Sequence, residues 1–113
     1  MDSIDEFTKL VRKYRDDRNW KQFHGPKDDM IAMLSEVGEL SEHFKWRRDN
    51  ELTEYINTHK KEIGEELCDV LFWILLMSYD YKIDIKKMFP EKMKKNEKKY
   101  PVEKYKGKHT GKI

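Results

Sequence analysis

Cysteine and long apolar segments are scarce in this chain of 113 residues. Cys68 is the one cysteine, so no disulfide can form within the chain, and we expect a reducing, cytoplasmic setting. Its place in an apolar stretch predicts a small buried thiol. The longest apolar run, residues 70–77, is far shorter than the about 20 residues that span a bilayer. We therefore expect neither a disulfide-stapled scaffold nor an association with membranes.

Glycine and proline are also few, with five and three copies. Neither a phosphate-binding glycine loop nor a dinucleotide glycine fingerprint is present. Nucleophilic catalysis is poorly supported, because no serine is flanked by glycines in the manner of a nucleophile elbow and Cys68 has no evident histidine partner. Catalysis by this chain would have to use water activated by a metal ion.

The apolar residues recur at helical spacing, and strand-like alternation of useful length is absent. Ser3 and Glu6 form a capping-box pattern, Pro26 suits the first turn of a helix, and Asp84 can cap another helix that Pro90 should kink or restart. The expected helices cover residues 3–18, 26–47, 58–81 and 85–100. Residues 48–57 permit either a short helical turn or a tight connection.

These helices predict an all-α fold, a four-helix-type bundle with antiparallel helices that is completed by oligomerisation. The helix expected at 58–81 is apolar nearly all round its centre, which requires burial on several sides. We expect residues 1–101 to form one domain and residues 102–113 to form a basic, extended or disordered tail. The basic character begins earlier, because residues 86–113 hold eleven Lys against three Glu.

Two acidic pairs dominate the middle of the chain: Glu36 with Glu39, and Glu66 with Asp69. Residues three apart share one face of a helix, and both pairs lie among apolar residues. Carboxylates gathered in such surroundings repel one another, and a hard divalent cation, above all Mg²⁺, would relieve that repulsion. Glu62 lies four residues before Glu66 and so shares its helix face, which makes it a candidate general base outside the metal's direct ligands. For any one of these residues, a solvated helix surface is the simpler interpretation.

A carboxylate bundle that holds two irons is the main alternative metal site. It requires a Glu three residues before a His on the bundle helices. The residues three before the four histidines are Lys21, Leu40, Ile56 and Lys106. None of them is Glu, so the sequence does not support a di-iron centre.

Several motifs occur together between about residue 19 and residue 101. They are E-x-x-E in SEVGEL, E-x-x-D in EELCDV, NW-x-x-FH, FKW and KM-x-x-N-x-x-x-YP. The two acidic motifs are separated by the 26 residues between Glu39 and Glu66. In this combination the chain resembles the MazG-like all-α NTP pyrophosphatases, in particular their dCTP pyrophosphatase branch. The resemblance implies hydrolysis of a nucleoside triphosphate at the α-phosphorus, giving a monophosphate and pyrophosphate. It implies Mg²⁺, with Mn²⁺ able to substitute, on Glu36, Glu39, Glu66 and Asp69, and assembly as a homodimer or homotetramer.

The same resemblance points to aromatic and polar residues that would hold the base and sugar. These residues are Trp20, Lys21, Gln22, Phe23, His24, Trp46 and Trp73. Val11 and Trp73 depart from the branch, which has His and Tyr at the matching positions, so pyrimidine deoxynucleotides are a lead and broader triphosphate housecleaning stays open. Lys92, Asn96 and Tyr100 follow one another by one turn on the last helix and are candidates for contacting phosphate oxygens.

The sequence thus carries two hypotheses of different kinds. The first is a magnesium-dependent pyrophosphohydrolase whose general base is Glu39 or Glu62. The second is a non-catalytic helical module that binds nucleic acid or an acidic partner through its lysine-rich end. That end lacks a known nucleic-acid reading motif, and lysines beside a triphosphate would already have a use, so we favour the first hypothesis.

Overall fold

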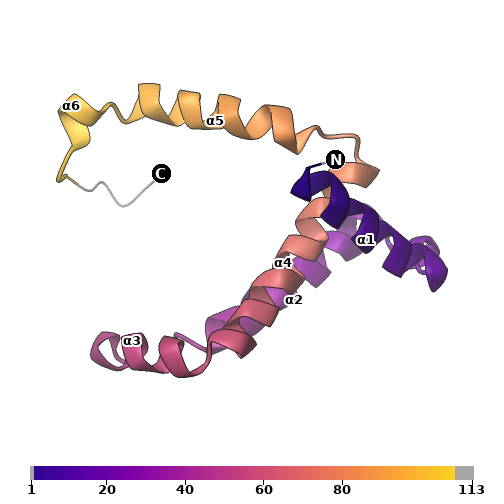
Figure 1. Cartoon of the computed structure of the whole chain (residues 1–113), viewed down its shortest axis with the longest axis horizontal. Helices are drawn as coiled ribbons and strands as arrows, with labels where there is room; N and C mark the ends of the chain where they lie inside the picture. Colours follow the sequence, from indigo (N-terminus) through magenta and orange to yellow (C-terminus); the bar gives the residue numbers. More distant parts are fainter. Residues whose placement is uncertain (1, 109–113) are drawn as a thin grey trace. The chain divides into compact units, whose positions relative to one another are not determined.

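The computed structural model describes residues 2–108, and every regular element within them is helical (Figure 1). The elements are α1 (Ser3–Asp17), the 3₁₀ turn η1 (Lys21–Phe23), α2 (Pro26–Glu42), α3 (Asp49–Thr58), α4 (Lys60–Asp80), α5 (Ile85–Lys99) and α6 (Val102–Tyr105). The all-α fold class is confirmed. None of the described helices is long and apolar enough to cross a membrane.

The chain divides into two compact units, one ending at Tyr81 and the other beginning at Lys82. In the first unit α4 packs against α1, α2 and α3. The helices α2 and α4 lie side by side and run antiparallel (Figure 1). Ile63, Leu75 and Leu76 of α4 are the buried apolar side chains of this unit. The helix α4 is therefore the element on which the first unit is assembled.

The observed helix ends correct the expected ones. The N-cap of α1 is Asp2, whose carboxylate accepts a hydrogen bond from the backbone N–H of Asp5 at 2.9 Å. The predicted capping box of Ser3 and Glu6 is therefore wrong, because Ser3 is already the first residue of the helix. The helix α2 begins at Pro26 as expected but ends at Glu42 instead of near residue 47. There the backbone changes to tighter bonds that span three residues, from the N–H of His43 to Leu40 and from that of Phe44 to Ser41. Residues 48–57 were left undecided by the sequence; α3 covers Asp49–Thr58, and the next helix begins at Lys60 instead of near residue 58.

The second unit contains α5 and α6. Asp84 caps α5 as predicted by accepting from the N–H of Lys87 at 3.2 Å, and the helix continues through Pro90, so it does not restart there. Pro90 removes one backbone donor, and good helix formers on both sides carry the helix onward. The prediction of an extended tail is wrong for residues 102–105, which form α6 against Tyr100: the ring of Tyr105 lies 5.2 Å from that ring, edge to face. The rest of the predicted tail beyond Lys108 lies outside the described residues.

One face of α4 is open in the single chain. Leu67, Leu71 and Ile74 are 54%, 40% and 38% exposed, and Cys68 beside them is exposed as well. The prediction of a buried thiol is therefore wrong for this chain. The apolar neighbours of Cys68 do not bury it, because α1, α2 and α3 cover other parts of the helix surface.

Candidate active site

The two acidic stretches meet where α2 and α4 pack side by side. Glu36, Glu39 and Glu66 each bring a carboxylate oxygen within 4.8 Å of the others. The spacing of three residues puts Glu36 and Glu39 on one face of α2, and the antiparallel α4 brings Glu66 opposite them. Two helices far apart in the sequence thus build one acidic cluster.

Asp69 and Glu62 lie on the same helix as Glu66 but outside this closest group. Asp69 is nevertheless near enough for its charge to raise the pKa of Glu36. Glu62 is exposed one turn before Glu66, toward the start of α4.

The cluster brings like charges together in partly buried surroundings. Burial raises the pKa of Glu36, and the charges of Glu39, Asp69 and Glu66 raise it further. One carboxylate oxygen of Glu36 and one of Glu66 are buried without a hydrogen-bond partner among the described residues. Exposed acids are common without a metal, but buried unpaired oxygens are costly. The donor set consists of hard carboxylate oxygens, so these residues fit Mg²⁺.

His43 is a neighbour of the cluster that the sequence reasoning missed. Its Nε2 lies 3.9 Å from a carboxylate oxygen of Glu66, and its Nδ1 is 2.8 Å from the hydroxyl of Tyr55. The Tyr55 ring stacks on His59 at 3.9 Å, and the guanidinium of Arg47 lies 3.5 Å from the centre of the same ring. The signal that could have found His43 is its spacing, because it follows Glu36 by two helical turns and therefore shares its face.

The aromatic loop between α1 and α2 is tied to the end of α1. The N–H of Trp20 donates to the carbonyl of Arg15 at 3.1 Å, and its ring meets Tyr14 edge to face at 5.8 Å. Gln22 donates to the carbonyl of Asn19 at 3.0 Å. Lys21 and Phe23 of η1 are exposed.

His24 ends this loop against α4. Its ring lies 5.2 Å from the ring of Trp73, at an interplanar angle of 60°. Trp73 follows Asp69 by one turn and Glu66 by two, so it extends the face of α4 that carries the acids. The structure therefore brings together His24 and Trp73, two of the residues expected to hold the base.

A buried polar cluster that was not anticipated lies beside His24. Asp29 is 0% exposed and accepts from the hydroxyl of Tyr81 at 2.9 Å. Arg15 is 1% exposed and pairs with Asp80 at 2.5 Å. Burial opposes the charge on Arg15, but the hydrogen bond and charge of Asp80 outweigh it and raise the Arg15 pKa. The sequence showed these residues only as ordinary helix-end charges, although Asp29 precedes Glu36 by two turns.

Trp46 lies away from the other expected base-binding residues of the first unit. It follows the C-terminal end of α2, whereas His24 precedes the N-terminal end. Its side chain is 75% exposed, and its indole N–H donates to Glu42 at 2.6 Å. The hydrogen bonds from Trp46 and Lys45 lower the pKa of Glu42. The described chain does not place Trp46 and His24 in one site.

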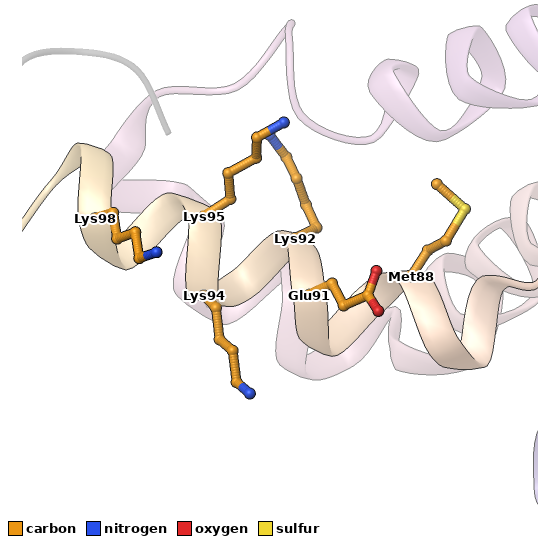
Figure 2. Close-up of a pocket in the computed structure, with 6 residues that line it drawn as sticks. All are labelled: Met88, Glu91, Lys92, Lys94, Lys95 and Lys98. Atoms are coloured by element: carbon orange, nitrogen blue, oxygen red, sulfur yellow. The ribbon is translucent and has the colours of Figure 1, made fainter.

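The expected phosphate-contacting residues belong to the second unit. Lys92 lines an open hollow on α5 together with Met88, Glu91, Lys94, Lys95 and Lys98. Figure 2 shows Lys92 and Lys95 extending to the same side of the helix. Asn96 is half-buried, and its amide nitrogen lies 3.9 Å from the sulfur of Met93. Tyr100 is the C-cap residue of α5, and the ammonium group of Lys99 lies 5.6 Å from the centre of its ring.

Known proteins resemble this chain in sequence, and a solved structure resembles it in fold. Curated relatives include dCTP pyrophosphatase 1 of Mus musculus, 31% identical over 102 residues, and that of Homo sapiens, 30% identical over the same length; each alignment covers 88% of this chain. The chain spans only 60% of the length of these relatives. A crystal structure of a pyrophosphatase from Archaeoglobus fulgidus superposes with a TM-score of 0.83 at 35% identity, covering 89% of this chain and 94% of that one.

The profile of the MazG-like family matches residues 31–111, which include both acidic pairs and α5. The match therefore contains the acidic cluster and the lysine-bearing helix, and the solved relative shares the fold over almost its whole length. The chain belongs to the MazG-like family.

Proposed function

We propose that this protein is a nucleoside triphosphate pyrophosphohydrolase that converts a (d)NTP and water to a (d)NMP and pyrophosphate. The acidic cluster is the observation that carries the proposal: three carboxylates from two helices lie within 4.8 Å, and two of them have buried, unpaired oxygens. The names of the relatives, dCTP pyrophosphatase and pyrophosphatase, support the same activity. We propose the cytoplasm as its setting, since its substrates are soluble nucleotides.

Glu36, Glu39, Glu66 and Asp69 are the residues that would hold Mg²⁺. When bound, the ion supplies positive charge for the triphosphate and makes water more acidic. Acids alone would repel such an anion, so the chain's carboxylates bind the substrate only through the cation. Glu39 and Glu62 are exposed and are the two candidates to accept a proton from the attacking water.

The remaining residues would bind the rest of the nucleotide. The rings of His24 and Trp73, which already touch, would contact the base, with Trp20, Lys21, Gln22 and Phe23 nearby in sequence. Lys92, Asn96 and Tyr100 would meet phosphate oxygens, as a helix carrying successive cationic and amide donors can do. Trp46 would join the site only from another copy of the chain, which agrees with our proposal of a homodimer or homotetramer. We propose dCTP or a related pyrimidine nucleotide as the preferred substrate.

The test is a panel of canonical and modified nucleoside triphosphates with MgCl₂, in which monophosphate and pyrophosphate are both quantified. We expect equal amounts of the two products and a loss of activity in Glu39→Ala and Asp69→Ala. The loss should exceed the roughly 10–100-fold that removal of an outer-shell partner costs. Glu65→Ala is the matched control, because Glu65 is an exposed carboxylate of α4 that lies about 100° around the helix from Glu66.

Release of orthophosphate alone would contradict the proposal. Salt-dependent DNA binding without turnover would instead favour the lysine-rich face of α5 as a binding surface.

A further inference from the structure

The carboxylate of Glu66 presents its two oxygens to different surroundings. Oε1 lies 3.9 Å from Nε2 of His43, whereas Oε2 is buried without a hydrogen-bond partner among the described residues. Oε2 of Glu36 is buried in the same way, and both residues belong to the acidic cluster. A buried acceptor without a partner is costly, so these unpaired oxygens are the ones that a cation would satisfy. Glu66 is thus divided between an oxygen that faces an imidazole and an oxygen left for an ion.

The imidazole of His43 is held in this orientation from α3. Its Nδ1 is 2.8 Å from the hydroxyl of Tyr55. The ring of Tyr55 is itself fixed, because it stacks on His59 with centroids 3.9 Å apart and has the guanidinium of Arg47 3.5 Å from its centre. The same guanidinium donates to the backbone carbonyl of His43 at 2.9 Å. One side of the imidazole is therefore anchored, and the other side faces Glu66.

The nitrogen that faces Glu66 must carry a hydrogen for this contact to be attractive, because an ionised carboxylate only accepts hydrogen bonds. The hydroxyl of Tyr55 can donate or accept, so it is compatible with a hydrogen on Nε2 whether or not Nδ1 carries one as well. The 3.9 Å separation is longer than a hydrogen bond, and a movement of about 1 Å by either side chain closes it. The two side chains are 17% and 23% exposed, so neither is locked in a tightly packed core.

We propose that His43 is a positioning residue that attracts Oε1 of Glu66 through its Nε2–H, so that Glu66 offers a cation Oε2 alone. The proposal rests on the part of the proposed function that places Mg²⁺ on the acidic cluster. Mg²⁺ requires near-ideal octahedral geometry, whereas Ca²⁺ accepts more oxygens and also carboxylates bound through both of theirs. His43 thereby favours Mg²⁺ over Ca²⁺ without touching either ion.

The test compares Mg²⁺ and Ca²⁺ binding in the absence of nucleotide. NMR titrations of the ¹⁵N-labelled full-length chain with MgCl₂ or CaCl₂ give both dissociation constants. We expect His43→Leu to weaken Mg²⁺ binding by about 10-fold, the lower end of the cost of removing a partner that orients a metal ligand. Ca²⁺ binding should weaken less, because the released Glu66 can bind this ion through both oxygens. The ratio of the two affinities is the decisive quantity, since a general loss of structure would lower both alike.

Two further substitutions and one matched control complete the design. His43→Gln can place an amide N–H near the position of Nε2, so it should keep most of the Mg²⁺ preference. Tyr55→Phe removes only the hydroxyl that anchors His43 and should reduce the preference less than His43→Leu does. Tyr79→Phe is the control, because it removes a hydroxyl near the C-terminal end of α4, where the ring contacts Arg12, and it should leave both dissociation constants unchanged. Circular dichroism checks folding, and Tyr55→Phe is the deciding variant if His43→Leu does not fold.

An unchanged ratio of Mg²⁺ to Ca²⁺ affinity in folded His43→Leu would overturn the inference, as would equal losses in His43→Gln and His43→Leu. Mg²⁺ binding that is lost in Glu36→Gln but unaffected in His43→Leu would overturn it while leaving the metal site intact. An absence of triphosphate hydrolysis in the substrate panel would refute the proposed function alone, because the titrations contain no nucleotide and require no turnover.

Discussion

Glu36 is the residue of the acidic cluster whose pKa shows the effect of burial and charge repulsion. Burial and the charges of Glu39 and Asp69 raise its pKa above the ordinary value, so the folded chain holds this proton more tightly than the unfolded chain. Stability from this group is therefore present at low pH. It is lost as pH rises from the unfolded pKa through the folded one. Above that window the ionised Glu36 destabilises the metal-free protein.

We predict that Glu36→Gln raises the melting temperature of the metal-free protein at neutral pH, because the amide removes one of the repelling charges and keeps the shape. The gain should disappear as the pH falls below the ordinary pKa of Glu, where both states carry the proton. The same variant should lose most of the stabilisation that MgCl₂ gives the unmodified chain, since binding to the folded state is its source. Thermal denaturation with MgCl₂ or EDTA at several pH values measures all three effects.

Glu42→Gln serves as the control for this prediction. Its pKa is lowered by Trp46 and Lys45, the opposite direction from Glu36, so its replacement should not stabilise the metal-free chain and should leave the MgCl₂ effect intact. An equal response to MgCl₂ in Glu36→Gln and the unmodified chain would contradict the assignment of Glu36 as a metal ligand.

At the scale of elements, the buried pair of Arg15 and Asp80 joins the end of α1 to the end of α4. A buried ion pair is weak evidence of net stability, but removal of one partner leaves an uncompensated charge. Arg15 of this pair also anchors the start of the loop formed by residues 20–24, since its backbone carbonyl accepts a hydrogen bond from the backbone N–H of Trp20. The pair therefore connects the packing of two helices to the loop that would hold the base.

We predict that Arg15→Leu destabilises the fold by about 3–5 kcal/mol, because Asp80 is left buried without its cation. The double variant Arg15→Leu/Asp80→Leu should recover most of that loss, since apolar pairs can replace buried ion pairs at little cost. Urea denaturation followed by circular dichroism gives the free energies of unfolding. Lys13→Leu is the control: Lys13 pairs with Asp17 on the same helix with side chains 74% and 55% exposed, so its loss should cost less than about 1 kcal/mol. Strict additivity of the single variants would contradict a coupled pair.

Helix periodicity predicted α1, α2, α4 and α5 because each has a strong apolar face or a clear cap. It failed where tertiary contacts decide the outcome. The helix α2 ends at Glu42, where the backbone changes to bonds that span three residues. The helix α3 forms where Tyr55 packs between His43 and His59. The short α6 is supported by the contact of Tyr105 with Tyr100. The contacts of Tyr55 with His43 and of Tyr105 with Tyr100 leave no periodic trace in the sequence.

The acidic cluster was the most predictable part of the site, since the spacing of three within each pair and the apolar surroundings favoured a meeting of the two helices, and three of the four acids lie in it. Its neighbours were less predictable. His43 and Asp29 share the face of Glu36 by seven-residue spacing, but a single histidine or aspartate on a helix is usually solvated. Their burial depends on α3, α4 and the loop before α2, which only the folded chain brings together.

At the scale of the whole molecule, the single chain leaves apolar faces uncovered on three helices. Leu10 of α1 is 65% exposed, Leu34 of α2 is 63% exposed, and Leu67 of α4 is 54% exposed. Soluble monomers rarely expose large continuous apolar patches, and the same patch on a second copy is self-complementary across a two-fold axis. A second copy of the chain is therefore the occupant we propose for these faces.

We predict that the protein sediments as a homodimer or homotetramer at micromolar concentration, and that Leu71→Lys shifts it toward the monomer. In a two-fold interface the substitution acts on both copies and buries two unpaired ammonium groups, which costs several kcal/mol in total. Lys61→Glu, a charge change at an exposed position of the same helix, should leave the oligomer intact. If the unmodified chain sediments as a monomer at that concentration, the open face of α4 is not an interface between copies, and Trp46 then has no route into the site near His24.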